Sequence, residues 1–120
     1  MELYTIQLAK WRRAKELGIP LIDTTVKSGE EAFSPTWDMV SGHKQGTLTD
    51  EEYTALYKEL MLKSIKRSPA RWAELMKMGK VAIACYCGKG KFCHRHLLAE
   101  ILEKLCRHNL ITFVHLGELE

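Results

Sequence analysis

Side chains that can carry chemistry crowd into residues 85–96, which read CYCGKGKFCHRH. Three of the four cysteines of the chain lie in this stretch, together with two histidines, two lysines and one arginine. Residues of these types can bind an anion, ligate a metal ion or supply a nucleophile. The stretch is therefore the candidate site, and the spacing of its residues bears on each of the three chemistries.

Anion binding is the first hypothesis. The glycines at Gly88 and Gly90 allow a tight turn that leaves backbone N–H groups free. The helix predicted to follow would direct its N-terminus toward the same place. Lys89, Lys91 and Arg95 would add positive charge, and an arginine can hold a phosphate or carboxylate with two parallel hydrogen bonds. The stretch lacks the glycine spacing of nucleoside-triphosphate loops and of dinucleotide-binding turns.

A metal site is the second hypothesis. Zinc would take its ligands from Cys85, Cys87, Cys93 and His94. Cys85 and Cys87 are two apart on a predicted strand, so they share a face. His94 and His96 are two apart on a predicted helix, so they diverge. Because there is also no Cys-x-x-Cys pair, the spacing favours a protein without a cofactor and leaves zinc as an alternative.

A reactive thiol is the third hypothesis. Cys93 falls at the predicted helix N-terminus near Lys91 and Arg95, a setting that favours a thiolate. Cys87, at the end of the strand, is a second candidate thiol. Neither cysteine has an arginine at the spacing found in phosphatase or rhodanese loops. The candidate catalytic residues are therefore Cys93 and Asp23, which lies near the end of another predicted strand.

Periodic apolar patterns predict the elements that position this stretch. Two boundaries carry capping signals, Gly18 as a helix C-cap and Thr49 with Glu52 as a capping box. Residues 27–47 form a long irregular segment, which is typical of a functional loop or of one with a short helix of its own. Strands are expected over residues 2–8, 19–26, 81–86 and 110–116, and helices over residues 9–17, 49–66, 68–78 and 93–107.

Strands interleaved with helices predict a single α/β domain over residues 1–120. Its sheet would be small, four-stranded, mostly parallel and Rossmann-like, with strand order 2-1-3-4 and flanking helices. Ligands of such sheets bind beyond the carboxyl ends of the strands. The residues expected there, with those of the turn, are Lys10, Trp11, Asp23, Thr24, Thr25, Trp37, Tyr86, Cys87, Gly88, Lys89, Gly90, Lys91, Cys93, His94 and Arg95.

The distribution of charge supports an anionic partner. The net charge is +3, and no acidic residue lies between Glu74 and Glu100, a segment that holds five lysine and arginine residues. An anionic, nucleotide-like small molecule is therefore the expected ligand. Only the positive charge supports nucleic-acid binding. The sequence leaves open whether the protein forms a homodimer.

The sequence predicts a cytoplasmic protein with no membrane partner. No apolar run approaches the ~20 residues of a membrane helix. The N-terminal residues lack the basic start and apolar run of a secretory signal. In a reducing cytosol, the four cysteines are expected to be thiols, ligands or core residues such as Cys106, and not disulfides.

Four short motifs carry a resemblance to a known family. They are LID at residues 21–23, FSP at 33–35, CYC at 85–87 and CHRHLLA at 93–99. With them the chain resembles the uncharacterised-domain family 488, small bacterial and phage proteins in which a buried strand leads through a cysteine-containing turn into Cys-His-Arg and a helix. The resemblance implies an α/β sandwich with a parallel sheet and a site at Asp23 and residues 93–95. Thr24 and Thr25 stand where family members usually carry an arginine.

These observations predict a protein that binds a nucleotide-like or other phosphorylated small molecule, for example to sequester a nucleotide signal. Asp23 would bind a hydroxyl of the ligand, and Trp37 or Tyr86 would pack on a ring. Two alternatives stay open. One is an enzyme acting on such a ligand, either a glycosidic-bond hydrolase or transferase or a thiol-dependent enzyme. The other is a zinc-stabilised interaction module.

Overall fold

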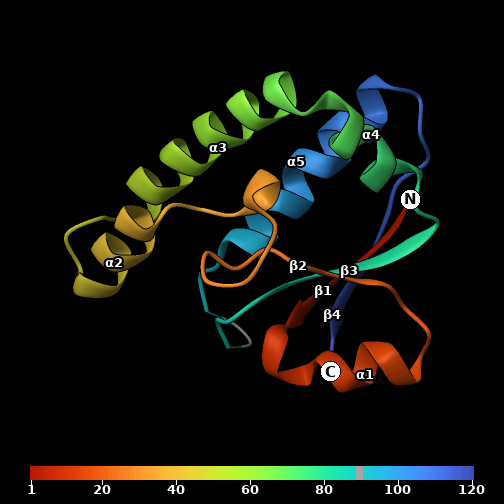
Figure 1. Cartoon of the computed structure of the whole chain (residues 1–120), viewed down its shortest axis with the longest axis horizontal. Coiled ribbons are helices and arrows are strands. Elements are labelled where there is room, and N and C mark those ends of the chain that lie inside the picture. Colours follow the sequence, from red (N-terminus) through yellow and green to blue (C-terminus); the bar gives the residue numbers. More distant parts are fainter. Residues whose placement is uncertain (89–90) are drawn as a thin grey trace.

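The computed structural model describes residues 1–88 and 91–120 and shows a four-stranded sheet in which every neighbouring pair is parallel. The strands are β1 (Glu2–Gln7), β2 (Leu21–Asp23), β3 (Lys80–Cys85) and β4 (Val114–Leu119). They lie side by side in the order β2-β3-β1-β4, and helices flank the sheet (Figure 1). The predicted α/β class with a small parallel sheet is therefore confirmed.

The strand order differs from the predicted 2-1-3-4. β3 lies between β2 and β1, with Ile83 opposite Ile22 on one side and opposite Thr5 on the other. Both orders place β3 inside the sheet, as the burial of residues 81–85 requires, and they differ in its neighbours, which are β2 and β1 instead of β1 and β4. An apolar run predicts such a central strand, but it does not say which strands lie beside it.

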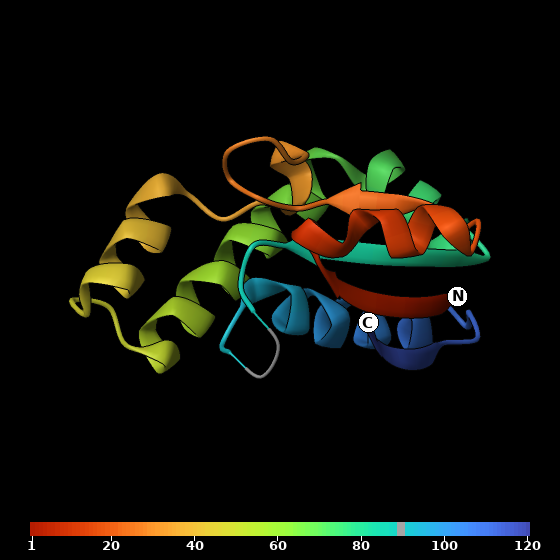
Figure 2. The same cartoon turned by 90° about the horizontal axis from the view of Figure 1, so that it is seen from below.

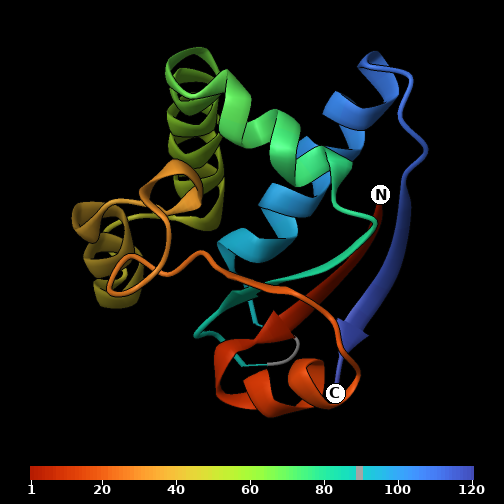
Figure 3. The ribbon, with the colours of Figure 1, turned by 45° about the vertical axis from the view of Figure 1, so that its right-hand side comes forward.

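Helices cover the two faces of the sheet unequally. A 3-10 turn, η1 (Leu8–Lys10), and the short helix α1 (Trp11–Glu16) lie on one side. The other side carries α3 (Asp50–Arg67), α4 (Pro69–Lys77) and α5 (His94–His108) (Figures 1 and 3). The helix α2 (Trp37–Gln45) follows a second 3-10 turn, η2 (Glu31–Phe33), and extends beyond one end of the strands (Figure 2). None of the helices in the described part of the chain is both long and apolar enough to cross a membrane.

Alternate residues of β3 supply two separate cores. Val81 and Ile83 belong to the larger core, with Trp72 of α4 and residues of α3 and α5. Ala82 and Ala84 belong to the smaller core under α1. Small side chains on that face let a helix of six residues pack closely against the strand. Cys85 continues the alternation and therefore points to the face that carries α5.

The predicted element boundaries hold where a capping signal marks them. Gly18 has the left-handed φ of 68°, as its C-cap role requires. Thr49 and Glu52 form the predicted capping box at the start of α3. Two strands differ from the prediction, since β2 spans only three residues and β4 begins at Val114 instead of residue 110. The long segment 27–47 carries η2 and α2.

Candidate functional site

A pocket of about 690 Å³ lies at the carboxyl end of β3. Its walls come from the segment that follows β2, from α2 and α3, and from the turn between β3 and α5. Eight of the predicted ligand contacts line it together. They are Thr25, Trp37, Tyr86, Cys87, Gly88, Lys91, Cys93 and His94.

About half of the residues that line the pocket were not predicted from the sequence. Three of these residues belong to α2, and the others lie on the segment between β2 and α2, on α3 and in the turn before α5. The missed residues are Val26, Lys27, Pro35, Val40, His43, Lys44, Tyr53 and Phe92. The usable signals were the long irregular segment 27–47, which is typical of a functional loop, and the pair of basic residues at positions 43 and 44 within it.

Several predicted contacts do not line the pocket. Lys10 belongs to η1 and Trp11 to α1, where Trp11 packs against the guanidinium of Arg12 at 5.0 Å from the ring centroid. Lys89 and Gly90, predicted to belong to the anion-binding turn, lie outside the described residues.

Asp23 shapes the segment after β2. Its carboxylate accepts hydrogen bonds from the backbone N–H of Thr25 at 2.8 Å and from the hydroxyl of Ser28 at 2.6 Å. These bonds hold the chain in a tight turn. Asp23 does not line the pocket, so in this conformation its carboxylate supports the wall and does not face a ligand.

Thr24 fixes the orientation of His94. The Nε2 atom of His94 lies 2.8 Å from the carbonyl oxygen of Thr24 and 2.9 Å from its Oγ1. That hydroxyl donates its own hydrogen to the carbonyl oxygen of Ala84 at 2.7 Å. Nε2 must therefore carry the ring hydrogen. Burial lowers the pKa of His94 to about 4, so the ring is neutral at pH 7 with its lone pair on Nδ1.

Arg95 was expected to contact an anion, and the structure corrects this. Its side chain is fully buried, and its guanidinium binds both carboxylate oxygens of Glu118, at 3.2 and 2.8 Å. The remaining contacts go to the sulfur of Cys85 and the carbonyl oxygen of Cys87, both at 2.9 Å. Burial disfavours the Glu118 carboxylate, but hydrogen bonds and the charge of Arg95 outweigh it, so its pKa lies below the usual value. Arg95 therefore ties β4 to the turn.

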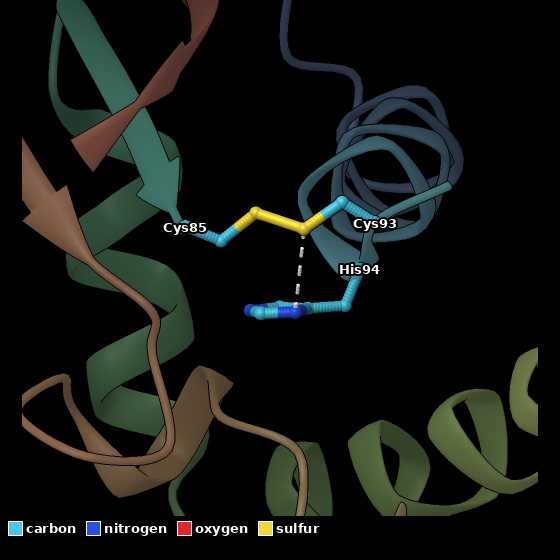
Figure 4. Close-up of side chains that lie close together, drawn as sticks. All are labelled: Cys85, Cys93 and His94. Atoms are coloured by element: carbon cyan, nitrogen blue, oxygen red, sulfur yellow. Dashed lines mark hydrogen bonds between the residues drawn. A yellow bond between two sulfur atoms is a disulfide. The ribbon is translucent and has the colours of Figure 1, made fainter. Parts of the chain in front are cut away.

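Cys85 and Cys93 are joined by a disulfide, contrary to the expectation of free thiols (Figure 4). The cause is the fold, which brings the last residue of β3 beside the residue that precedes α5. Cys87 and Cys106 are free. Burial raises the pKa of the Cys87 thiol, an effect only partly offset by Arg95 and Lys91, so Cys87 is not activated as a nucleophile.

The charged side chains that line the pocket are lysines. Its described lining contains the cationic side chains Lys27, Lys44 and Lys91, but no aspartate or glutamate. The aromatic wall includes Tyr53, whose pKa burial raises, so the phenol stays neutral. Phe92 contacts Tyr53 edge-on, with ring centroids 5.4 Å apart.

One family model matches the chain. It is that of DUF488-N3a, described as the active DUF488-N3 subclade, and it covers residues 10–105. The chain therefore belongs to this family. No curated protein and no solved structure matches the chain.

Proposed function

We propose that this member of the DUF488-N3a family binds a nucleotide-like or other phosphorylated small molecule in the pocket at the carboxyl end of β3. The observation that carries the proposal is the composition of the described pocket wall, which joins three lysines and four aromatic rings without a carboxylate. The volume of about 690 Å³ falls within the ~300–1,000 Å³ of small-molecule sites. Sequestration of a nucleotide signal in the cytoplasm is one form that this binding could take.

The lysines favour an anion. Lys27, Lys44 and Lys91 reach the pocket from three different segments, so their charges surround its contents. In a concave site with low-dielectric walls, charges of one sign add to a potential that concentrates ligands of the opposite sign. With no acidic side chain in the described wall to compensate them, a phosphate group is the ligand feature that they fit best.

The aromatic residues favour a ring. Trp37 is 58% exposed and Tyr86 is 53% exposed, although both line the pocket. Large apolar side chains that remain accessible at a concave site provide flat surfaces for a ligand. A base between such rings and a phosphate near the lysines would use both features of the wall.

An enzyme acting on the same class of ligand is the second candidate, because the family model that matches describes its subclade as active. Asp23 and Cys93 are the residues proposed for catalysis. Asp23 would first have to leave its bond to Ser28, and Cys93 its disulfide.

The test is isothermal titration calorimetry with adenosine monophosphate, uridine monophosphate, ribose 5-phosphate, adenosine and inorganic phosphate. We expect a phosphorylated compound to bind, and the Lys44→Gln variant to bind it about tenfold more weakly, equivalent to ~1.4 kcal/mol. Trp37→Ala should weaken a base-containing ligand by roughly 5- to 150-fold, the ~1–3 kcal/mol of one stacked base.

Lys104→Gln is the matched control, since Lys104 is an exposed lysine on α5 outside the pocket wall. Absence of binding by every phosphorylated compound, or equal losses in the Lys44 and Lys104 variants, would refute the proposal. Chromatography of the same mixtures after incubation separates the two candidates, because only an enzyme converts the ligand to a product.

A further inference from the structure

We propose that Cys85, Cys93 and His94 form a zinc site in the wall of this pocket. This goes beyond the binding of a phosphorylated ligand and does not depend on it. The three side chains come from the end of β3 and the start of α5 and converge on one point (Figure 4). Two thiolates and one imidazole are a ligand set that zinc takes in proteins.

The distances fit a shared ion. The two sulfur atoms and a ring nitrogen of His94 all lie within 4.8 Å of one another. The Cys93 sulfur is 3.8 Å from Nδ1. A tetrahedral zinc with bonds of about 2.3 Å to sulfur and about 2.0 Å to nitrogen would separate these two atoms by about 3.5 Å.

The distance between the Cα atoms of the two cysteines also favours a shared metal ion. The Cα atoms of Cys85 and Cys93 are 7.4 Å apart. Most disulfides span about 4.4–6.8 Å between Cα atoms. A separation beyond this range suits two sulfur atoms that bind the same ion from opposite sides.

His94 provides the independent argument. Its Nε2–H is committed to Thr24, so the lone pair of Nδ1 faces the sulfur of Cys93. A disulfide sulfur has no hydrogen to donate, and His94 is only 6% exposed, so Nδ1 has no hydrogen-bond donor in the disulfide form among the contacts of the described residues. A buried acceptor without a donor is costly. A zinc ion would accept this lone pair, and the bond from Nε2–H to a backbone carbonyl is the usual support of a zinc-bound histidine.

The charges around the cluster also balance. Arg95 donates a hydrogen bond to the Cys85 sulfur at 2.9 Å, and such a bond strengthens when the sulfur carries a negative charge. Glu118 compensates the guanidinium. Two thiolates compensate a divalent cation, so the buried group of zinc, two cysteines, Arg95 and Glu118 would have no net charge.

The number of ligands has a chemical consequence. Cys85, Cys93 and His94 all line the pocket, and three protein ligands with one open position are typical of catalytic zinc sites, whereas structural sites are closed by four. The fourth position would face the contents of the pocket. The chemistry that zinc supplies there is polarisation of a bound oxygen or activation of water.

The disulfide and the zinc site are two states of the same atoms. A dithiol reductant supplies two electrons and two protons to the disulfide and is itself oxidised to a disulfide, which leaves two thiols. Zinc binding then releases both thiol protons to solvent as two sulfur–zinc bonds form. The protein must therefore be reduced before metal is offered.

The experiment is metal analysis of the full chain after treatment with a dithiol reductant, zinc loading and gel filtration without chelator. We expect one zinc per chain by mass spectrometry and by elemental analysis. Competition with a chromophoric chelator should give an affinity that falls more than about 100-fold in Cys93→Ser and in His94→Gln, more than the loss of an outer-shell partner usually costs. The matched control is Cys106→Ser, a buried free cysteine outside the cluster, which should keep its zinc.

A second measurement covers variants that fail to fold. Cobalt loading of the reduced wild-type protein should give sulfur-to-cobalt charge-transfer absorption and tetrahedral ligand-field bands. Reduced, folded wild-type protein that takes up no zinc or cobalt would overturn the proposal. So would equal zinc affinity in the Cys93 and Cys106 variants. Calorimetry with nucleotides on zinc-loaded and zinc-free protein tests the phosphorylated-ligand proposal separately, because metal content is measured without any ligand.

Discussion

Replacing Glu118 by glutamine should destabilise the protein strongly, although the residue lies on an edge strand. The change removes the negative charge that faces Arg95, whose side chain is completely buried. Breaking one partner of a fully buried ion pair costs ~3–5 kcal/mol, because the other charge stays in the interior unpaired. Glu118 keeps 18% of its side chain exposed, and the glutamine oxygen can still accept one bond, so we expect a loss of about 2–3 kcal/mol.

Urea denaturation followed by far-ultraviolet circular dichroism measures this loss. The midpoint should fall while the slope with urea stays constant, since the surface exposed on unfolding does not change. For 120 residues the entropy of unfolding is about 0.25 kcal/mol/K, so the melting temperature should fall by about 8–12 °C. Glu103→Gln is the control, because it breaks the exposed pair with Arg107 and should cost less than ~1 kcal/mol.

The pH dependence gives a second test of the same ion pair. The pKa of Glu118 is lowered in the folded protein from its usual 4.5, so its contribution is complete above pH 4.5 and is lost as the pH falls through the lowered value. The stability difference between wild type and Glu118→Gln should therefore be constant near neutrality and shrink below pH 4.5. A loss near neutrality no larger than that of Glu103→Gln, or a difference independent of pH, would refute the reasoning.

Three further changes test the scaffold by the same denaturation assay. Ser64→Ala should cost ~1–3 kcal/mol, because it leaves the buried Nε1–H of Trp72, which donates to the serine hydroxyl at 3.0 Å, without an acceptor; an unchanged midpoint would contradict this. Thr49→Ala should cost ~1 kcal/mol by removing one half of the capping box of α3, and a loss below ~0.3 kcal/mol would show that the cap is not needed. Gly29→Ala should be severely destabilising, since a Cβ there would lie 2.4 Å from the nearest backbone atom, whereas Gly79→Ala meets nothing within 4 Å and should be close to neutral.

Local signals in the sequence predicted most of the elements. An alternating pattern gave the position of β1, an apolar run gave that of β3, and a cap gave the start of α3 to within a residue. The order of the strands could not be obtained in this way, because it depends on which strands share an edge. β1 and β3 both need two neighbours, and nothing local to either strand says that β3 lies next to β2.

The lining of the candidate pocket was predicted only in part for a similar reason. The turn that carries Cys87 and Cys93 was identified because its reactive residues are close in sequence. The opposite wall, with His43 and Lys44, comes from a helix some forty residues earlier and was missed. Arg95 shows the limit of charge as evidence, since its partner Glu118 is 23 residues away on another strand and only the fold brings the two together.

The central position of β1 has a consequence for how the protein is made. Leu3 pairs with Val81 of β3 on one side and with His115 of β4 on the other, 78 and 112 residues further along the chain, so β1 finds both partners only after these later segments have been synthesised. Such non-local pairings close large loops before they gain any contact energy, which slows folding. The apolar residues of β1 must therefore stay unpaired until β3 and β4 have been made, and a nascent chain that exposes such residues is prone to aggregation.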